Sequence, residues 1–333
     1  MNDELLFRKI AASTNPIGEI KKLKGEISVG FVEYLNRVTF ALRNQKRLPD
    51  ALRVNEWAQH AAHNLGDPLM EAHSLFNGAQ LERDLGKLEE AEKSFREAFQ
   101  LYEKYGSLVD MFDGTAGLLE NLASRGKNEE LKQVAQHTLN KVQEIGQFTG
   151  DIKSSLLKIC HILRLQNDTE VVRTYIELLL QLGEQFGDRE SEAEASGLLA
   201  EVIFDENPKD AQRLFQRALE YDRLTNRSRL QAIDLGNLGN VSFRLGELEN
   251  AAKYYMECVA IRDREAVYEG MEADLFRFYH VLHYLGRRPE AMQVHNRMME
   301  FTSGSPTFFK PITYQIRLDD RGRKKDGIEF GQP

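Results

Sequence analysis

A helix-packing pattern recurs in this chain with a period of about forty residues. It is clearest in residues 77–98 and 237–258, where a glycine is followed after five positions by alanine and, four positions later, by an aromatic residue. The same template fits seven positions, which we call anchors, separated by 40, 40, 41, 39, 40 and 40 residues: Ala51, Ala91, Leu131, Val172, Ala211, Ala251 and Ala291. A repeat of this length indicates stacked supersecondary units, each of which packs on its neighbours.

Turn signals recur at two further offsets from the anchors. Glycine or asparagine precedes most anchors by five residues and follows most of them by fifteen, at Gly86, Gly126, Asn167, Gly246 and Gly286 and at Gly66, Gly106, Gly146, Gly187 and Asn226. These residue types favour positive φ in tight turns and at the left-handed residue that ends a helix. Each unit is therefore predicted to contain a helix, a short turn, a second helix and a helix stop.

The pattern resembles the tetratricopeptide repeat, in which small residues let two helices cross closely. The residues that carry the resemblance best are Leu235, Leu238, Gly239, Ser242, Ala251, Tyr255 and Cys258, followed by Leu75, Ala79, Glu82, Ala91, Phe95 and Ala98. The period of about forty is similar to the longer repeats of the kinesin-light-chain type. The resemblance implies an all-α, right-handed superhelical solenoid of about seven helix-turn-helix repeats. The units around Leu131 and Val172 depart from it because they lack the small anchor.

The repeats divide the chain into three predicted regions. Residues 1–31 are expected to form capping helices, and residues 312–333 a C-terminal tail that is partly extended or disordered. The seven repeats between them are expected at about 32–71, 72–111, 112–152, 153–191, 192–231, 232–271 and 272–311. Apolar and polar residues alternate from Ile312 to Leu318, which is typical of a strand. The tail either lies over the last repeat or enters the groove as an internal ligand.

Composition and charge exclude several classes of protein. The net charge of −8 offers no basic surface to phosphates, so nucleic acid is not an expected partner, and the basic run Arg321–Lys325 is more typical of a solvated tail. No stretch approaches eighteen apolar residues, and four charges lie within residues 1–10, so neither a membrane span nor a signal peptide is expected. Cys160 and Cys258 are too few and too far apart for a disulfide framework or a zinc cluster. We expect a cytoplasmic protein with buried thiols.

Catalytic and cofactor motifs are not found in the sequence. There is no phosphate-binding Gly-x-x-x-x-Gly-Lys-Ser/Thr loop, no Gly-x-Gly-x-x-Gly, no Gly-x-Ser-x-Gly and no His-Glu-x-x-His. His280 and His283 can share a helix face, but a metal site would need a third ligand. We therefore expect no enzyme activity, no cofactor and no metal.

Candidate binding residues follow from the family resemblance, which places the groove on the first helix of each repeat. The predicted groove residues are Asn36, Arg43, Gln80, Arg83, His161, Arg164, Asn237, Asn240, Arg244, Arg277, His280 and His283. Phe40, His73 and Phe76 are expected beside them, and acids are few, namely Glu33, Asp84, Asp113 and Glu120. The resemblance implies that an asparagine at the Asn240 position holds a peptide backbone.

The four arginines Arg43, Arg83, Arg164 and Arg244 either pair with carboxylates of an acidic or extended peptide or are ordinary solvated charges. The predicted function is a scaffold or adaptor that binds a peptide segment of a partner protein in the groove. The alternative is a peptide- or signal-responsive regulator that changes superhelix shape when its ligand binds. The sequence leaves the oligomeric state open.

Overall fold

The computed structural model describes residues 3–23, 25–142, 145–166, 169–302, 314–315 and 329–330. Within these ranges the chain is built from α-helices, apart from two strands of two residues each. Two short helices, α1 (Asp3–Ala11) and α2 (Pro16–Lys22), come before the repeats. Asn15 caps α2 by accepting a hydrogen bond from the backbone N–H of Gly18 at 3.0 Å.

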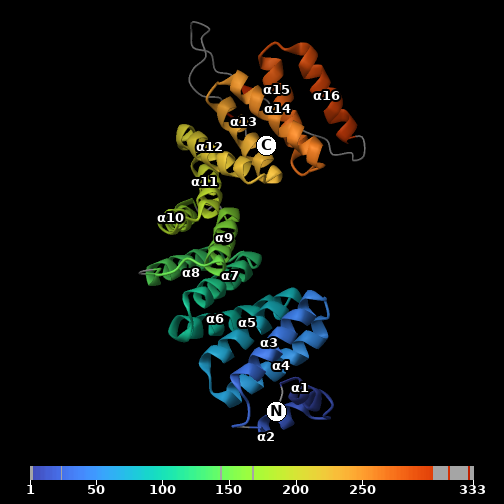
Figure 1. Ribbon diagram of the computed structural model, residues 1–333, viewed down its shortest axis with the longest axis vertical. Helices are drawn as coiled ribbons and strands as arrows, with labels where there is room; N and C mark the ends of the chain where they lie inside the picture. The colour runs from blue at the N-terminus through green and yellow to red at the C-terminus, as the bar shows by residue number, and fades with distance from the viewer. Residues whose placement is uncertain are drawn as a thin grey trace. The chain divides into compact units, whose positions relative to one another are not determined.

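Seven pairs of consecutive helices follow in the described residues, and six of them form hairpins in which the two helices pack on each other (Figure 1). The seven pairs are α3 (Val29–Asn44) with α4 (Leu48–Leu65), α5 (Pro68–Asp84) with α6 (Leu88–Tyr105), α7 (Leu108–Ser124) with α8 (Asn128–Lys141), α9 (Gly150–Leu165) with α10 (Thr169–Phe186), α11 (Arg189–Ile203) with α12 (Pro208–Leu224), α13 (Ser228–Arg244) with α14 (Leu248–Glu265), and α15 (Met271–Tyr284) with α16 (Arg288–Thr302). The prediction of an all-α protein made of helix-turn-helix repeats is confirmed.

The small anchors lie where helices cross. Ala51, Ala91, Ala211 and Ala251 have no exposed surface. In the same crossings, a Cβ added to Gly239 would approach the ring of Tyr255 to 2.6 Å, closer than real Cβ atoms come. The recurring small residues of the sequence are therefore the positions at which no larger side chain fits.

The turns within the hairpins use positive φ. Gly86, Gly126, Gly246 and Gly286 have φ between 69° and 77°. Lys46 holds the equivalent place in the first hairpin, with φ of 60°. The turn prediction is confirmed at the four glycines, while Asn167 lies outside the described residues.

Most of the predicted helix stops are also left-handed. Gly66, Gly187 and Asn226 have φ of 70°, 69° and 56°. Gly106 and Gly146 depart from the expectation: Gly106 has φ of −83° and ψ of 167°, and Gly146 does not have a positive φ. The residue after Gly106, Ser107, must be extended because it forms the capping box of α7 with Asp110, so the chain passes directly from one helix to the next.

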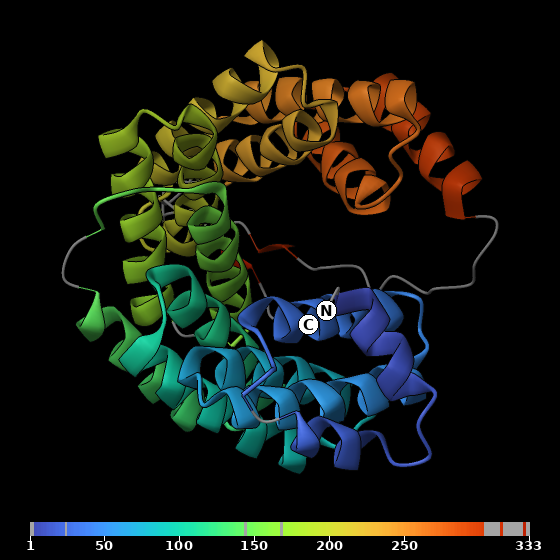
Figure 2. The ribbon, with the colours of Figure 1, turned by 60° about the horizontal axis from the view of Figure 1, so that its bottom comes forward.

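Contacts between Cα atoms divide the chain into two compact units, which we call the first unit (Met1–Tyr175) and the second unit (Ile176–Pro333). In the first unit, α1 and α2 pack on the first hairpin. Phe7 of α1 contacts Tyr34 and Trp57, with ring centroids 5.7 and 5.9 Å apart. Figure 2 shows from another side how the blue to green hairpins of this unit pack one against the next.

The second unit buries charged groups as well as apolar ones. Arg262 of α14 and Asp274 of α15 form an ion pair at 2.8 Å, with side chains only 6% and 7% exposed. Cys258 donates from Sγ to the carbonyl oxygen of Ala232 at 3.1 Å. Burial raises the pKa of the Cys258 thiol to about 12, and it does the same for Cys160 in the first unit, so both behave as neutral core residues.

Two strands, β1 (Tyr314–Gln315) and β2 (Glu329–Phe330), pair antiparallel, with Tyr314 opposite Phe330. β1 falls in the segment that the sequence predicts to be extended. Ile312, Ile316, Leu318 and Arg321–Lys325 lie outside the described residues, so both hypotheses for the tail stay predictions. None of the described helices is long and apolar enough to cross a membrane.

Candidate functional site

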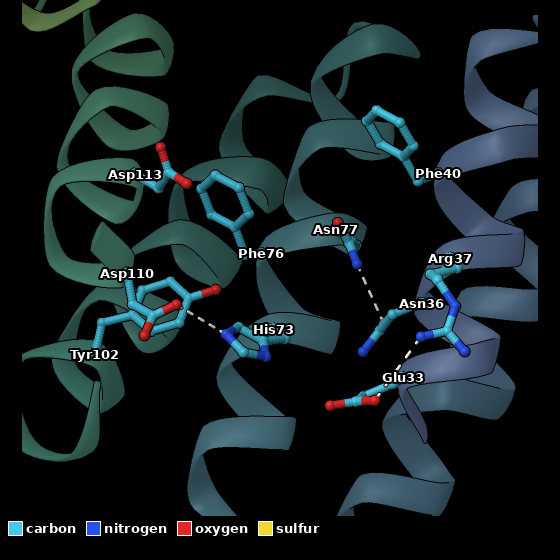
Figure 3. Close-up of a pocket in the computed structure, with 10 residues that line it drawn as sticks. All are labelled: Glu33, Asn36, Arg37, Phe40, His73, Phe76, Asn77, Tyr102, Asp110 and Asp113. Carbon is cyan, nitrogen blue, oxygen red and sulfur yellow. Dashed lines mark hydrogen bonds and ion pairs between the residues drawn. The ribbon is translucent and has the colours of Figure 1, made fainter. Parts of the chain in front are cut away.

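A cavity of about 690 Å³ opens on the first unit (Figure 3). We call it the α3–α7 cavity. Its walls come from the first helices of three consecutive repeats, together with one residue of α6. The lining residues are Glu33, Asn36, Arg37 and Phe40 of α3, His73, Phe76 and Asn77 of α5, Tyr102 of α6, and Asp110 and Asp113 of α7.

Helical periodicity explains why these residues share one surface. On each of the three first helices they recur at spacings of three, four or seven residues, which keeps them on one face. Gly117 lets α7 approach α5, because an added Cβ would meet the rings of Phe76 and Phe95 at 2.6 and 2.7 Å. The glycine therefore helps to bring the Asp110–Asp113 face of α7 up to Phe76.

A pair of side-chain amides crosses the cavity between neighbouring repeats. Nδ2 of Asn77 donates to Oδ1 of Asn36 at 3.2 Å, and both side chains are half-buried. An asparagine side chain offers two N–H donors and a carbonyl acceptor. This single bond therefore leaves the NH2 group of Asn36 able to donate to a ligand and the side-chain oxygen of Asn77 able to accept from one.

Aromatic rings line the cavity beside the amides. Phe76 packs edge-on against Phe95 and Tyr102, with ring centroids 5.5 and 6.0 Å apart, so its ring is held in place. Phe40, on the opposite wall, is 54% exposed. Burial, together with the charges of Asp110 and Asp113, raises the pKa of Tyr102, so its hydroxyl stays neutral.

The charges of the cavity are mostly negative. Asp110 contacts Nε2 of His73 at 2.9 Å and accepts from the backbone N–H of Ser107 at 2.8 Å. Burial opposes its ionisation, but these hydrogen bonds outweigh burial and lower the pKa of Asp110 to about 2. Asp113 accepts from the hydroxyl of Ser155.

Of the twelve predicted groove residues, Asn36 alone lines this cavity. The residues expected beside them also line it, namely Phe40, His73 and Phe76 and the acids Glu33 and Asp113. Arg43 instead pairs with Asp84 through two contacts of 2.7 and 3.2 Å and also donates to Gln80. Arg83 pairs with Glu120 at 2.5 Å. These two arginines are held by carboxylates of the neighbouring repeat, so they are not available in this arrangement as receptors for an acidic ligand.

In the second unit, the predicted asparagines are also engaged. Oδ1 of Asn240 accepts from the hydroxyl of Tyr255 at 2.7 Å, and Asn237 donates to Glu201 at 3.5 Å. Arg244 pairs with Asp205 at 2.9 Å. The amide N–H groups of Asn240 remain able to donate, so its predicted backbone contact stays a prediction.

The remaining predicted residues lie on α9 and α15. His161 and Arg164 are exposed on α9 of the first unit but do not line the cavity, and Arg277 lies 3.8 Å from Asp274. His280 and His283 both contact the ring of Tyr279, with centroids 5.2 and 6.2 Å away. Burial, followed by the nearby charge of His283, lowers the pKa of His280. Among the described residues, no group of three or more His, Cys, Asp or Glu side chains is placed to hold a metal.

Sequence reasoning missed four lining residues, namely Arg37, Asn77, Tyr102 and Asp110. Asn77 had a usable signal, because it precedes the anchor Ala91 by fourteen residues, as the predicted Asn237 precedes Ala251. Tyr102 had none, since it lies on a second helix and reaches the cavity only through the crossing of α6 with its neighbours.

Family models and solved structures agree with this architecture. The tetratricopeptide-repeat models match residues 72–105, which form the α5–α6 hairpin, and residues 235–264, which cover most of α13–α14. The chain therefore contains tetratricopeptide repeats in these two stretches. No curated protein sequence matches it.

Three solved structures resemble this chain in fold. The apo form of RapI has a TM-score of 0.63 at 12% identity, over 83% of this chain and 77% of that one. A signal-transduction ATPase with a tetratricopeptide repeat sensor from Pyrococcus horikoshii has 0.64 at 16% identity, over 86% and 44%. The apo form of the quorum sensor NprR from B. thuringiensis has 0.52 at 13% identity, over 83% and 76%. At these identities the likeness shows the fold alone.

Proposed function

We propose that this protein binds an extended peptide segment of a partner protein in the α3–α7 cavity. The observation that carries the proposal is the Asn36–Asn77 pair, set beside the fixed ring of Phe76 in a cavity of about 690 Å³. A peptide backbone presents one N–H and one C=O per residue. The NH2 group of Asn36 can donate to such a C=O, and the side-chain oxygen of Asn77 can accept from such an N–H. The cavity volume is in the usual range for ligand sites.

The binding is non-catalytic and of moderate strength. The lining residues offer amides, rings and carboxylates, and the affinity is shared among several weak contacts. We expect a dissociation constant in the micromolar range, which corresponds to about −8 kcal/mol.

The test uses a random peptide library displayed on phage and selected against the full chain. Enriched peptides are synthesised and titrated by calorimetry against the wild type, an Asn36→Ala/Asn77→Ala double variant and an Asn140→Ala control. Asn140 is an exposed amide on α8, paired with Gln136 and outside the cavity. We expect the double variant to bind about thirtyfold more weakly, since two hydrogen bonds of about 1 kcal/mol each are lost. The control should bind like the wild type.

Several results would contradict the proposal. A library that yields no enriched peptide, or peptides that bind the double variant and the wild type equally, would rule out a peptide site at the Asn36–Asn77 pair. If those peptides lose affinity for an Asn240→Ala variant instead, the site lies in the second unit. Far-UV circular dichroism of each variant separates lost binding from lost folding.

A signal-responsive regulator is the second candidate. Two of the similar structures are described as a tetratricopeptide repeat sensor and a quorum sensor, which favours a protein whose shape responds to its peptide. Small-angle scattering of the chain with and without the selected peptide distinguishes the two functions. A peptide-dependent change in the radius of gyration favours the regulator, and an unchanged profile favours the adaptor.

A further inference from the structure

The α7 wall of the cavity presents two carboxylates. Asp110 and Asp113 are three residues apart on one helical face, and Figure 3 shows them on the same side of the cavity, near Phe76 and Tyr102. Asp110 is held by His73 and Ser107, while Asp113 has the Ser155 hydroxyl as its partner. A hydroxyl donor leaves the charge of Asp113 uncompensated.

Charge in the rest of the cavity does not offset this wall. Glu33 lies 3.8 Å from Arg37, on the same helix, so that acid and that guanidinium balance each other on the α3 wall. Three carboxylates thus face one guanidinium around the cavity, and His73 adds a second positive charge only when it is protonated. The excess of negative charge lies on α7.

An aromatic ring lies beside the same carboxylates. Phe76 is fixed by its edge-on contacts with Phe95 and Tyr102, and its ring lies next to Asp113 in Figure 3. A cation near an aromatic face is attracted by the ring, and the aliphatic part of a lysine or arginine side chain packs on apolar surface. The ring and the carboxylate therefore suit different parts of one basic side chain.

We infer that the α3–α7 cavity selects peptides that carry a lysine or arginine, whose charged group pairs with Asp113 while its aliphatic part packs on Phe76. This inference rests on the proposed function and specifies its ligand. It reverses the charge expected from the sequence, where unpaired arginines suggested an acidic peptide. Arg43 and Arg83, the predicted groove arginines of the first two repeats, are paired with carboxylates, whereas Asp113 is not paired with a cation among the described residues.

The experiment takes one enriched peptide from the phage selection and removes its charge at each basic position in turn, replacing lysine with methionine. Each peptide is titrated against the wild type, Asp113→Asn and a Glu97→Gln control. Asp113→Asn removes the charge but keeps an oxygen that can accept from Ser155. Glu97 is exposed on α6, does not line the cavity and changes the net charge of the protein equally.

We expect Asp113→Asn to weaken binding of the basic peptide about tenfold, the usual size of a lost charge-assisted contact in a partly exposed site. It should leave the methionine peptide unaffected, and Glu97→Gln should change neither. Enriched peptides that depend on Asn36 and Asn77 but lack a basic residue, or that bind Asp113→Asn equally well, would overturn the charge preference while leaving the peptide site intact. Peptides that do not depend on the amide pair would overturn the proposed function itself.

Discussion

Asp234 is the residue whose replacement should change the stability of the second unit most distinctively with pH. Its side chain, on α13, is 6% exposed, and Asp222 of α12 is 4% exposed. Burial, and then the charge of Asp222, raises the pKa of Asp234 to about 8, and burial also raises the pKa of Asp222. Arg227 lies 3.3 Å from Asp222, but it also pairs with Glu190 and Glu194 and cannot balance every carboxylate.

The sign of the effect follows from the two states of the chain. An unfolded aspartate releases its proton near pH 3.8, whereas the folded Asp222–Asp234 pair keeps a proton to about pH 8. Between these values the folded state binds one proton more, so the free energy of unfolding falls by up to about 1.4 kcal/mol per pH unit as pH rises. Between pH 5 and pH 8 the loss is up to about 4 kcal/mol.

Asp234→Asn should remove most of this loss, because the amide is neutral at every pH and nearly the same size. Urea unfolding followed by far-UV circular dichroism at pH 5, 6, 7 and 8 measures the slope for the wild type, for Asp234→Asn and for Glu220→Gln, an exposed acid on α12. We expect the Asn variant to gain stability over the wild type as pH rises, and the control to follow the wild type. Equal slopes for wild type and Asp234→Asn would refute the argument.

Two further predictions concern packing and buried charge. Asp274→Ala should lower the free energy of unfolding by about 3–5 kcal/mol, because it leaves the Arg262 guanidinium buried without its carboxylate. The double replacement Arg262→Met/Asp274→Leu should cost less, and urea titrations that find it as unstable as Asp274→Ala or worse would contradict this. Ala91→Trp and Ala251→Trp, at anchors with no exposed surface, should overpack their crossings and cost about 1–3 kcal/mol or more. Unchanged melting temperatures in both would count against the repeat register.

The fold was predictable because its signals are local and repeated. Alanine at the anchors indicates a close helix crossing, and glycine in the turns indicates a positive φ. The chain repeats both signals along its length. Gly106 shows the limit of such signals. Gly106 adopts an extended and not a left-handed conformation, because Ser107 directly after it is the N-cap of the next helix.

The site was less predictable because it depends on which side chains meet across repeats. The sequence shows that Arg43 and Arg83 share a helix face with other groove positions, but not that Asp84 and Glu120 lie within reach of them. Their pairing depends on how far the first helix of one repeat is shifted along the first helix of the next. The sequence of a single repeat does not determine that shift. The sequence shows the acids themselves, but it does not show which of them are neutralised by an arginine of the neighbouring repeat.

These polar contacts between neighbouring first helices also affect how unfolding spreads along the first unit. Arg43–Asp84 joins α3 to α5, Arg83–Glu120 joins α5 to α7, and the Asn36–Asn77 bond adds a second link between α3 and α5. In a linear array, the strength of the coupling between neighbours sets how many repeats unfold as one cooperative block. Part of this coupling is electrostatic and only partly buried, so salt screens it. Ionic strength therefore changes the cooperativity of unfolding in the array as well as its stability. A peptide in the α3–α7 cavity would touch three of the coupled helices, so it would increase the number of repeats that unfold together.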